Sequence, residues 1–295
     1  MKYCTLLLAF LALSTARAQV VRPHFIRVAD SRLYVEESGR GPALLLLHGG
    51  LLDHRQWAPQ VKAWSRRFRV LNCDLRKHGF TQDGDSTFAN ADALARVLDS
   101  LGVRQAHVLG LSLGAVAALD FTLAYPARVH KLVLASPGLI GFDLDQDSAL
   151  VANNRRQAAA RQQHDTLAYA EWFVRSWVDG PHRQPAQTPA PVRALAAELV
   201  RYSLRHHRWT TGLRFHTAPP PRQRLDGVQV PALVLTGSLD WPGIGRLGDE
   251  LAQRLPHARR VALPGAAHLL NLEQPRRFAR EVQAFLREPE SLSRK

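Results

Sequence analysis

The sequence predicts an α/β protein with a doubly wound, mostly parallel sheet and an inserted helical cap. Along most of the chain, short apolar runs typical of buried parallel strands alternate with helical patterns. One long stretch, residues 141–226, breaks this alternation and is rich in helix-forming residues instead. The 295 residues would allow two domains, but one large domain with an insertion fits the length equally well.

Residues 1–18 are predicted to be a secretory signal peptide. Lys2 supplies a short positive start, an apolar run extends to Leu13, and Ala16-Arg17-Ala18 places small residues where signal peptidase reads them. The apolar run is too short for a stable transmembrane helix. We therefore expect a mature chain that begins at Gln19 and is secreted or periplasmic, with an uncleaved N-terminal anchor as the alternative.

The chain is strongly basic, with 39 Lys and Arg against 25 Asp and Glu and a net charge of +14. Residues 1–18 hold Lys2 and Arg17 and no acidic residue, so the net charge without them is +12. This charge permits non-specific contact with anionic surfaces. The basic residues are scattered and no nucleic-acid-binding motif accompanies them, so no specific nucleic-acid partner is predicted. Cys73, which would be the single cysteine of the mature chain, is expected to be a small core residue.

The expected strands and helices follow in chain order. Residues 24–30 and 32–38 alternate in polarity and are predicted to form an opening antiparallel pair. Buried parallel strands are expected at residues 43–48, 68–73, 106–111, 129–135, 231–236 and 258–263. Helices are expected at residues 56–66, 88–100, 113–125, 246–255 and 276–287.

The interrupting stretch is predicted to be the cap. It is helix-prone at residues 147–178 and 191–207, a proline-rich patch separates the two, and Pro219-Pro220-Pro221 closes it. This assigns residues 19–140 and 227–295 to the core and residues 141–226 to the cap. Packing against the core is favoured over lining a pocket for each of its large aromatic residues: Trp172, Phe173, Trp177, Tyr202, Trp209 and Phe215.

The sequence Gly110-Leu111-Ser112-Leu113-Gly114 follows an apolar strand and leads directly into an Ala-rich helix. A strand, a sharp turn and a helix with serine at the apex form a nucleophile elbow. The turn strains the serine backbone, and larger residues two positions before and after the serine would collide. A dinucleotide-binding loop does not fit, because the third glycine of its G-x-G-x-x-G pattern is missing.

A serine nucleophile needs a base and an orienting acid, in the chain order serine, acid, histidine. Asp240 follows the strand at 231–236 through a tight turn, and His268 follows the strand at 258–263 through a Pro-Gly turn. Backbone N–H groups of Leu113 and Gly50 are the expected oxyanion donors. His48 lies at the wrong end of the chain order and is expected to be structural.

These motifs together resemble the α/β-hydrolase fold superfamily, in its branch with a helical cap, over nearly the whole mature chain. The resemblance implies that Ser112 is the nucleophile, Asp240 the acid and His268 the base, and that Gly50 and Leu113 form the oxyanion hole. It implies no metal or other cofactor, and the His206-His207 pair has no convincing partners for a metal. The motifs that carry it are residues 46–50 with Trp57 beyond, residues 74–76 with His78-Gly79, residues 110–114, residues 237–240, and residues 264–268 with 271–275.

The loop at residues 74–81 departs from the family pattern, and the family pattern allows two positions for the acid. The family loop Asp-x-Arg-Gly-x-Gly-x-Ser has Lys77 in place of its first glycine and Thr81 in place of its serine, which puts the local backbone shape in doubt. Some relatives carry the acid after an earlier strand, here the one at 129–135. The first carboxylate after that strand is Asp143, which is therefore the alternative acid.

The expected function is hydrolysis of a carboxylic ester, lactone or thioester of a small molecule through an acyl-enzyme. A cofactor-free haloperoxidase, a C–C bond hydrolase or an acyltransferase would use the same triad and remains an alternative. A non-catalytic ligand-binding protein is the alternative of another class, because fold alone does not determine function. The substrate and the oligomeric state are not predicted.

Overall fold

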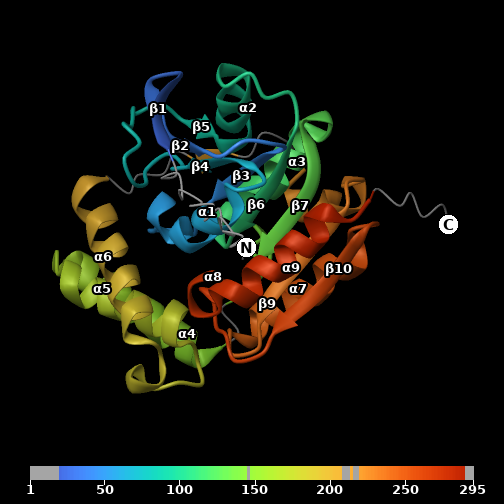
Figure 1. Cartoon of the computed structure of the whole chain (residues 1–295). Helices are drawn as coiled ribbons and strands as arrows, with labels where there is room; N and C mark the ends of the chain where they lie inside the picture. The colour runs from blue at the N-terminus through green and yellow to red at the C-terminus, as the bar shows by residue number, and fades with distance from the viewer. Residues whose placement is uncertain (1–19, 145–146, 208–212, 215–218, 290–295) are drawn as a thin grey trace, which may run out of the picture.

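The computed structural model describes residues 20–144, 147–207, 213–214 and 219–289 (Figure 1). The predicted signal peptide, Gln19, Trp209 and Phe215 lie outside the described residues. Within the described ranges, no helix combines the length and apolarity needed to cross a membrane.

An eight-stranded sheet forms the centre of the molecule, in the order β1-β2-β4-β3-β6-β7-β9-β10. The β1–β2 and β2–β4 pairs are antiparallel and all other neighbours are parallel. The predicted doubly wound, mostly parallel sheet and its opening antiparallel pair are therefore confirmed. The strands are β1 Val21–Val28, β2 Ser31–Ser38, β3 Ala43–Leu47, β4 Arg69–Cys73, β6 Ala106–Leu111, β7 Val129–Ala135, β9 Ala232–Gly237 and β10 Ala258–Leu263.

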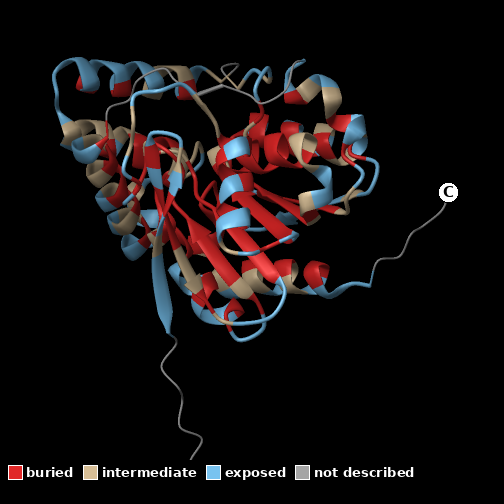
Figure 2. Ribbon diagram, turned by 90° about the horizontal axis from the view of Figure 1, so that it is seen from above, coloured by how far each residue is buried: buried red, intermediate tan, exposed pale blue. Residues whose placement is uncertain are grey.

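Helices cover both faces of this sheet, as the continuous apolar strands require. In β3, Leu45 and Leu47 belong to the core beneath α2, α3 and α7, whereas Leu44 and Leu46 belong to the core beneath α1 and α9. Figure 2 shows the buried residues concentrated in the sheet and on the helix faces turned toward it. The bounds are η1 His54–Trp57, α1 Ala58–Trp64, α2 Asn90–Ser100, α3 Leu113–Ala124, η2 Pro126–Arg128, α7 Pro242–Arg254, α8 Leu270–Glu273 and α9 Pro275–Arg287.

Between β7 and β9 the chain forms a separate group of helices, which lie together at one end of the molecule (Figure 1). Asp147 and Asp165 begin the first two by accepting backbone N–H bonds as N-caps. We call α4, α5, η3, η4 and α6 the cap helices; the domain boundaries at residues 141 and 226 stay a prediction. The elements are α4 Ser148–Gln162, α5 Thr166–Val174, the π-helix η3 Arg175–Asp179, η4 Pro185–Gln187, α6 Ala190–His206 and η5 Pro221–Gly227.

Three local expectations were wrong at their edges. The helix expected from residue 88 begins at Asn90, because β5 (Phe88–Ala89) pairs with β8 (Leu213–Arg214), a two-residue strand in the stretch assigned to the cap. The helix expected from residue 56 begins as the 3₁₀ turn η1. The helix expected from residue 246 begins already at Pro242, because proline fits the first turn of a helix.

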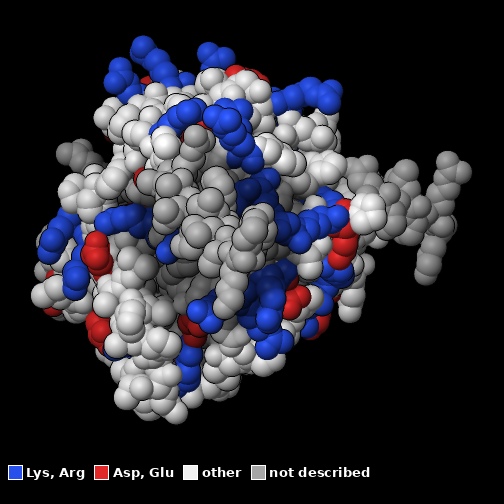
Figure 3. Space-filling model, viewed as in Figure 1, with Lys and Arg blue, Asp and Glu red and all other residues white. Residues whose placement is uncertain are grey.

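The basic surface and the buried cysteine agree with what the sequence predicts. On the face seen in Figure 3, Lys and Arg side chains clearly outnumber Asp and Glu. Cys73 is a free, fully buried residue of β4, as expected of a core position. Burial raises the pKa of its thiol well above the usual range, which leaves it unreactive.

Candidate active site

Ser112 stands at the turn between β6 and α3. Its backbone has φ 54° and ψ −111°, a strained conformation for a residue with a side chain. A Cβ on Gly110 would overlap the backbone of Gly114, and a Cβ on Gly114 would overlap the backbone of Leu47. The two glycines therefore permit the turn that presents Ser112, for the steric reason that the sequence predicted.

Asp240 and His268 come from the loops after the neighbouring strands β9 and β10, and the structure brings them together. His268 Nδ1–H donates to Asp240 Oδ2 over 2.8 Å, with side chains only 5% and 1% exposed. The other carboxylate oxygen of Asp240 accepts the backbone N–H of Trp241 at 2.8 Å. The acid therefore holds the imidazole by one oxygen and its own loop by the other, while the alternative acid Asp143 is exposed.

Ser112 and His268 line the same cavity, which has a volume of about 260 Å³ and also includes Gly50. A larger hollow of about 820 Å³ between α5 and α6 contains Glu171 and Arg193 and none of the predicted site residues. We take the smaller cavity as the candidate active site, because it holds the strained serine and the buried histidine that faces an acid.

Two backbone N–H groups are available for an oxyanion beside Ser112. Leu113 is the first residue of α3, so its N–H has no acceptor within the helix and carries the positive end of the helix dipole. Gly50 lies next to it, since a Cβ on Gly50 would be 3.7 Å from the Cβ of Leu113. Among the residues that the structure describes, no hydrogen-bond acceptor occupies either N–H.

The loop that carries Gly50 is held by buried side chains. Gly49 N–H donates to Gln56 Oε1 at 3.0 Å. His48 Nδ1–H donates to Gly49 O at 2.8 Å, and its Nε2 accepts the N–H of Leu75 at 3.0 Å. Burial lowers the pKa of His48 to about 4, so it stays neutral. The structural role expected for His48 is confirmed.

The two departures in the loop after β4 have structural explanations. Lys77 keeps a left-handed backbone, with φ 65°, at the position where the family has glycine. Its N–H donates to Asp83 at 2.7 Å and its ammonium donates to Gly84 O at 2.9 Å, which compensates the strain. Thr81 acts as the serine would, because its hydroxyl donates to Asp74 O at 2.8 Å and accepts the N–H of Tyr34 at 3.0 Å.

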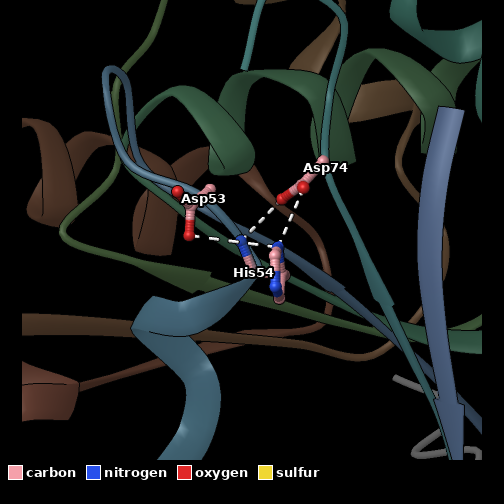
Figure 4. Close-up of side chains that lie close together, drawn as sticks. All are labelled: Asp53, His54 and Asp74. Atoms are coloured by element: carbon pink, nitrogen blue, oxygen red, sulfur yellow. Dashed lines mark hydrogen bonds and ion pairs between the residues drawn. The ribbon is translucent and has the colours of Figure 1, made fainter. Parts of the chain in front are cut away.

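Asp53, His54 and Asp74 form a buried cluster whose ligand atoms lie within 4.8 Å of one another (Figure 4). Hydrogen-bond donors already surround these oxygens. Asp74 accepts His54 N–H at 2.6 Å, His54 Nδ1–H at 2.8 Å and Phe80 N–H at 2.8 Å. Asp53 accepts Arg55 through both of its oxygens. A metal would have to displace these donors, so the cluster fits a scaffold for the loops better than a metal centre.

The cap helices supply the outer wall of the candidate active site. Gln157 of α4, Tyr169 and Phe173 of α5 and Trp177 of η3 all line its cavity. The Trp177 ring lies 4.6 Å, centroid to centroid, from the imidazole of His268. Phe173 belongs to the buried core and Trp177 packs against it, as favoured, and both residues line the cavity as well. Nothing in the local sequence around Gln157 indicated its position at the site.

A buried ion pair joins the cap helices to the loop of His268. Arg183 donates to Glu273 at 2.6 Å, and to Val178 O and Asp179 O at the end of η3. The other oxygen of Glu273 accepts the N–H of Ala267, the residue before His268, at 3.0 Å. Burial raises the pKa of Glu273, although Arg183 acts in the opposite direction. The sequence predicted a motif at residues 271–275 but not its partner in the cap.

The two adjacent cap histidines have separate roles. His206 is exposed, and its ring stacks on Tyr202 at 4.0 Å. His207 is buried; its Nδ1 lies 2.7 Å from Asp83 Oδ2 and its Nε2 lies 2.9 Å from Gly79 O. Both ring nitrogens of His207 therefore bond the loop after β4, and the pair does not form one site.

Comparison with known proteins places this chain among hydrolases. The sequence profile described as "Alpha/beta hydrolase family" matches residues 44–281. Carboxylesterase YbfK of Bacillus subtilis (strain 168) is 29% identical over 250 residues, which cover 83% of this chain and 80% of the relative. A 2-hydroxy-6-oxononadienedioate/2-hydroxy-6-oxononatrienedioate hydrolase of Burkholderia vietnamiensis (strain G4 / LMG 22486) is 30% identical over 280 residues, 88% of this chain and 92% of the relative. The crystal structure of carboxylesterase CesB (YbfK) from Bacillus subtilis superposes with a TM-score of 0.71 at 25% identity, covering 90% of this chain and 92% of that one.

Proposed function

The chain belongs to the alpha/beta hydrolase family, and we propose that it cleaves a carboxylic ester, lactone or thioester of a small molecule through an acyl-enzyme. The observation that carries the proposal is the Asp240–His268 hydrogen bond at a cavity that also contains the strained Ser112. The carboxylesterase of Bacillus subtilis supports an ester as the substrate class, because it is similar over most of both chains.

In the proposed reaction, Ser112 Oγ attacks the acyl carbon while His268 removes the hydroxyl proton. Negative charge develops on the former carbonyl oxygen, where the N–H groups of Gly50 and Leu113 stabilise it. The bond to the leaving oxygen or sulfur then breaks, and His268 returns its proton to the leaving group. Water attacks the acyl-enzyme while its proton passes to His268. The bond between Ser112 Oγ and the acyl carbon then breaks, His268 returns the proton to Ser112 Oγ, and the carboxylic acid leaves. Asp240 orients the imidazole and stabilises its charged form throughout.

The hydrolase of Burkholderia vietnamiensis makes C–C bond hydrolysis on the same triad the second candidate. Haloperoxidase chemistry and acyl transfer would also begin at Ser112, and each would require a different partner for the reaction. A non-catalytic ligand-binding protein would need neither the activated serine nor the buried acid–base pair.

Covalent labelling by a fluorophosphonate probe tests the proposal and separates an enzyme from a binding protein. We expect the wild-type protein to be labelled and Ser112→Ala to remain unlabelled. Ser112→Ala should also lose ester turnover by roughly 10⁴-fold or more while its circular dichroism is unchanged. Turnover of the variant at the wild-type rate would overturn the assignment. Esters, lactones and a ring-cleavage diketone assayed side by side then distinguish the two candidate reactions.

The proposed location of the mature protein is outside the cytoplasm, secreted or periplasmic, on the basis of residues 1–18 alone. The proposed non-specific contact is with an anionic surface. Arg276, Arg280 and Arg287 are exposed along α9, and Lys62 and Arg66 are exposed in and just after the adjoining α1. None of the five has an ion-pair partner among the residues that the structure describes. Such binding should weaken as salt is raised.

A further inference from the structure

The cavity at Ser112 is uncharged apart from the reacting groups. Within the described part of the chain, no Lys, Arg, Asp or Glu lines it, although the protein carries 39 basic residues. Its walls are leucine side chains of the core and the aromatic rings of Tyr169, Phe173 and Trp177. An anionic group placed there would lose hydration without gaining a cation, which disfavours its binding.

Gln157 is the exception to the apolar character of the cap wall. The residue is 7% exposed, and its Nε2–H donates to Ser176 Oγ over a long 3.4 Å. Ser176 donates its own hydroxyl proton to Trp172 O at 2.9 Å. Among the described residues, no hydrogen-bond partner is found for Gln157 Oε1, and this oxygen is not completely buried. Because Gln157 lines the cavity, we expect its Oε1 to be available to a hydrogen-bond donor on a molecule bound there.

Tyr169 adds a second neutral polar group to the same wall. Burial raises the pKa of its phenol, so the hydroxyl stays protonated at neutral pH. Burying a carboxamide and a phenol in an apolar wall costs free energy unless a ligand completes their hydrogen bonds. Neither group carries a charge, so neither would attract a carboxylate as an arginine does.

We infer that the enzyme selects substrates whose group in this cavity is electrically neutral and hydrogen-bonds to Gln157. The inference rests on the proposed function and specifies its substrate class. The cavity has a volume of about 260 Å³. Amides and hydroxylated chains that fit this volume can donate a hydrogen bond to Gln157 Oε1 and meet the description. Acyl groups or alcohols that end in a carboxylate do not.

Arg161 is a charged residue near the cavity that could bind an anionic substrate. It lies one helical turn after Gln157 on α4, is exposed, and acts electrostatically on Tyr169. It does not line the cavity. If Arg161 reached in to hold an anionic substrate, carboxylate esters would be good substrates and Arg161→Gln would abolish their hydrolysis.

The test compares two substrates that differ only in charge. p-Nitrophenyl esters of adipic acid are made with the far end as a carboxamide or as a free carboxylate. A second pair consists of the hexanoate esters of 4-hydroxybutanamide and 4-hydroxybutanoate, which places the same difference in the alcohol. For the pair whose variable group enters the cavity, we expect wild-type kcat/KM to favour the carboxamide by at least about 100-fold. Equal rates for amide and carboxylate in both pairs would overturn the inference.

A variant then assigns the preference to Gln157. For each enzyme we compare kcat/KM of the carboxamide ester with kcat/KM of p-nitrophenyl heptanoate. In Gln157→Leu this ratio should be about 3–10-fold lower than in the wild type, which corresponds to the net contribution of one neutral hydrogen bond. The matched control is Gln162→Leu, an exposed glutamine of the same helix, which should leave this ratio unchanged. An unchanged ratio in Gln157→Leu would exclude Gln157 as the determinant. Absence of hydrolysis of every ester in the wild type, together with no labelling of Ser112, would instead contradict the proposed function.

Discussion

The indole N–H of Trp241 donates to the backbone carbonyl of Ser176 over 2.7 Å. Trp241 follows the proposed catalytic Asp240 directly, and Ser176 precedes Trp177, whose ring lies against His268. Both partners are buried, so this bond ties the acid loop after β9 to the π-helix η3 of the cap. Short π-helical segments are often found at functional sites. Here the segment positions an aromatic ring on the proposed base.

Removal of the hydrogen bond between Trp241 and Ser176 should lower the stability of the protein by a measurable amount. In Trp241→Phe the carbonyl of Ser176 keeps its buried position and loses its donor, so we expect the free energy of unfolding to fall by about 1–3 kcal/mol. Denaturant unfolding followed by circular dichroism measures it. Trp172→Phe is the control, because the Trp172 ring is partly exposed beneath Arg156; its loss should be under about 0.5 kcal/mol. Equal losses in the two variants would contradict a specific role for the Trp241 bond.

Asp240 should be far more important to turnover than Asp143. Asp240→Asn preserves shape but removes the charge that stabilises the imidazolium of His268, so kcat should fall on the order of 10²–10⁴-fold. Asp143→Asn should be near normal, because Asp143 is exposed and His268 is already bonded to Asp240. Steady-state kinetics on any accepted ester checks both variants. The reverse pattern would move the acid to Asp143.

The contact between His207 and the loop after β4 should depend on pH. Both ring nitrogens face acceptors, Asp83 and Gly79 O, and only the imidazolium can donate to both. Burial lowers the pKa of His207, but these bonds and the charges of Asp83 and Asp74 outweigh it and raise the pKa above its ordinary value of 6.5. The resulting stabilisation is therefore complete below about pH 6.5 and is lost as the pH rises through the folded-state pKa.

We expect His207→Leu to be less stable than the wild type by about 2 kcal/mol at pH 6, the value of hydrogen bonds to a charged group. The difference should shrink by pH 9. Urea unfolding at the two pH values measures it, with His206→Leu as the control because His206 is exposed beside it. A stability difference that is the same at both pH values would show that His207 acts through packing alone.

The N-terminus of the exported protein should be Gln19. Residues 1–18 have the charge, the apolar run and the Ala-x-Ala ending of a cleaved signal. Mass spectrometry of the protein recovered from outside the cytoplasm of its native host checks the cleavage site. Recovery of the chain with Met1 intact from a cytoplasmic fraction would refute export.

Much of the fold could be predicted because parallel strands are buried on both faces. Continuous apolar runs such as residues 43–48 and 106–111 became β3 and β6 within a residue of the predicted bounds. The nucleophile elbow could be predicted because Gly110 and Gly114 are needed there: a larger side chain at either position would collide with nearby backbone. Asp240 and His268 could be proposed because the carboxyl ends of parallel strands meet at one edge of the sheet. Each of these deductions depends on local geometry or on a general rule of the fold.

The cap wall of the cavity depended on tertiary structure alone. Gln157 is one glutamine in a polar helix, and only the packing of α4 against α5 and η3 brings it to the cavity that contains Ser112. The Arg183–Glu273 pair joins residues 90 positions apart, and the π-helical turn that directs Trp177 onto His268 has no signature in its five residues. Local sequence determines the period of a helix and the strain of a turn. Which side chains of an inserted helix meet a distant strand end is decided by how the two surfaces pack, because those contacts act between residues that no local pattern relates.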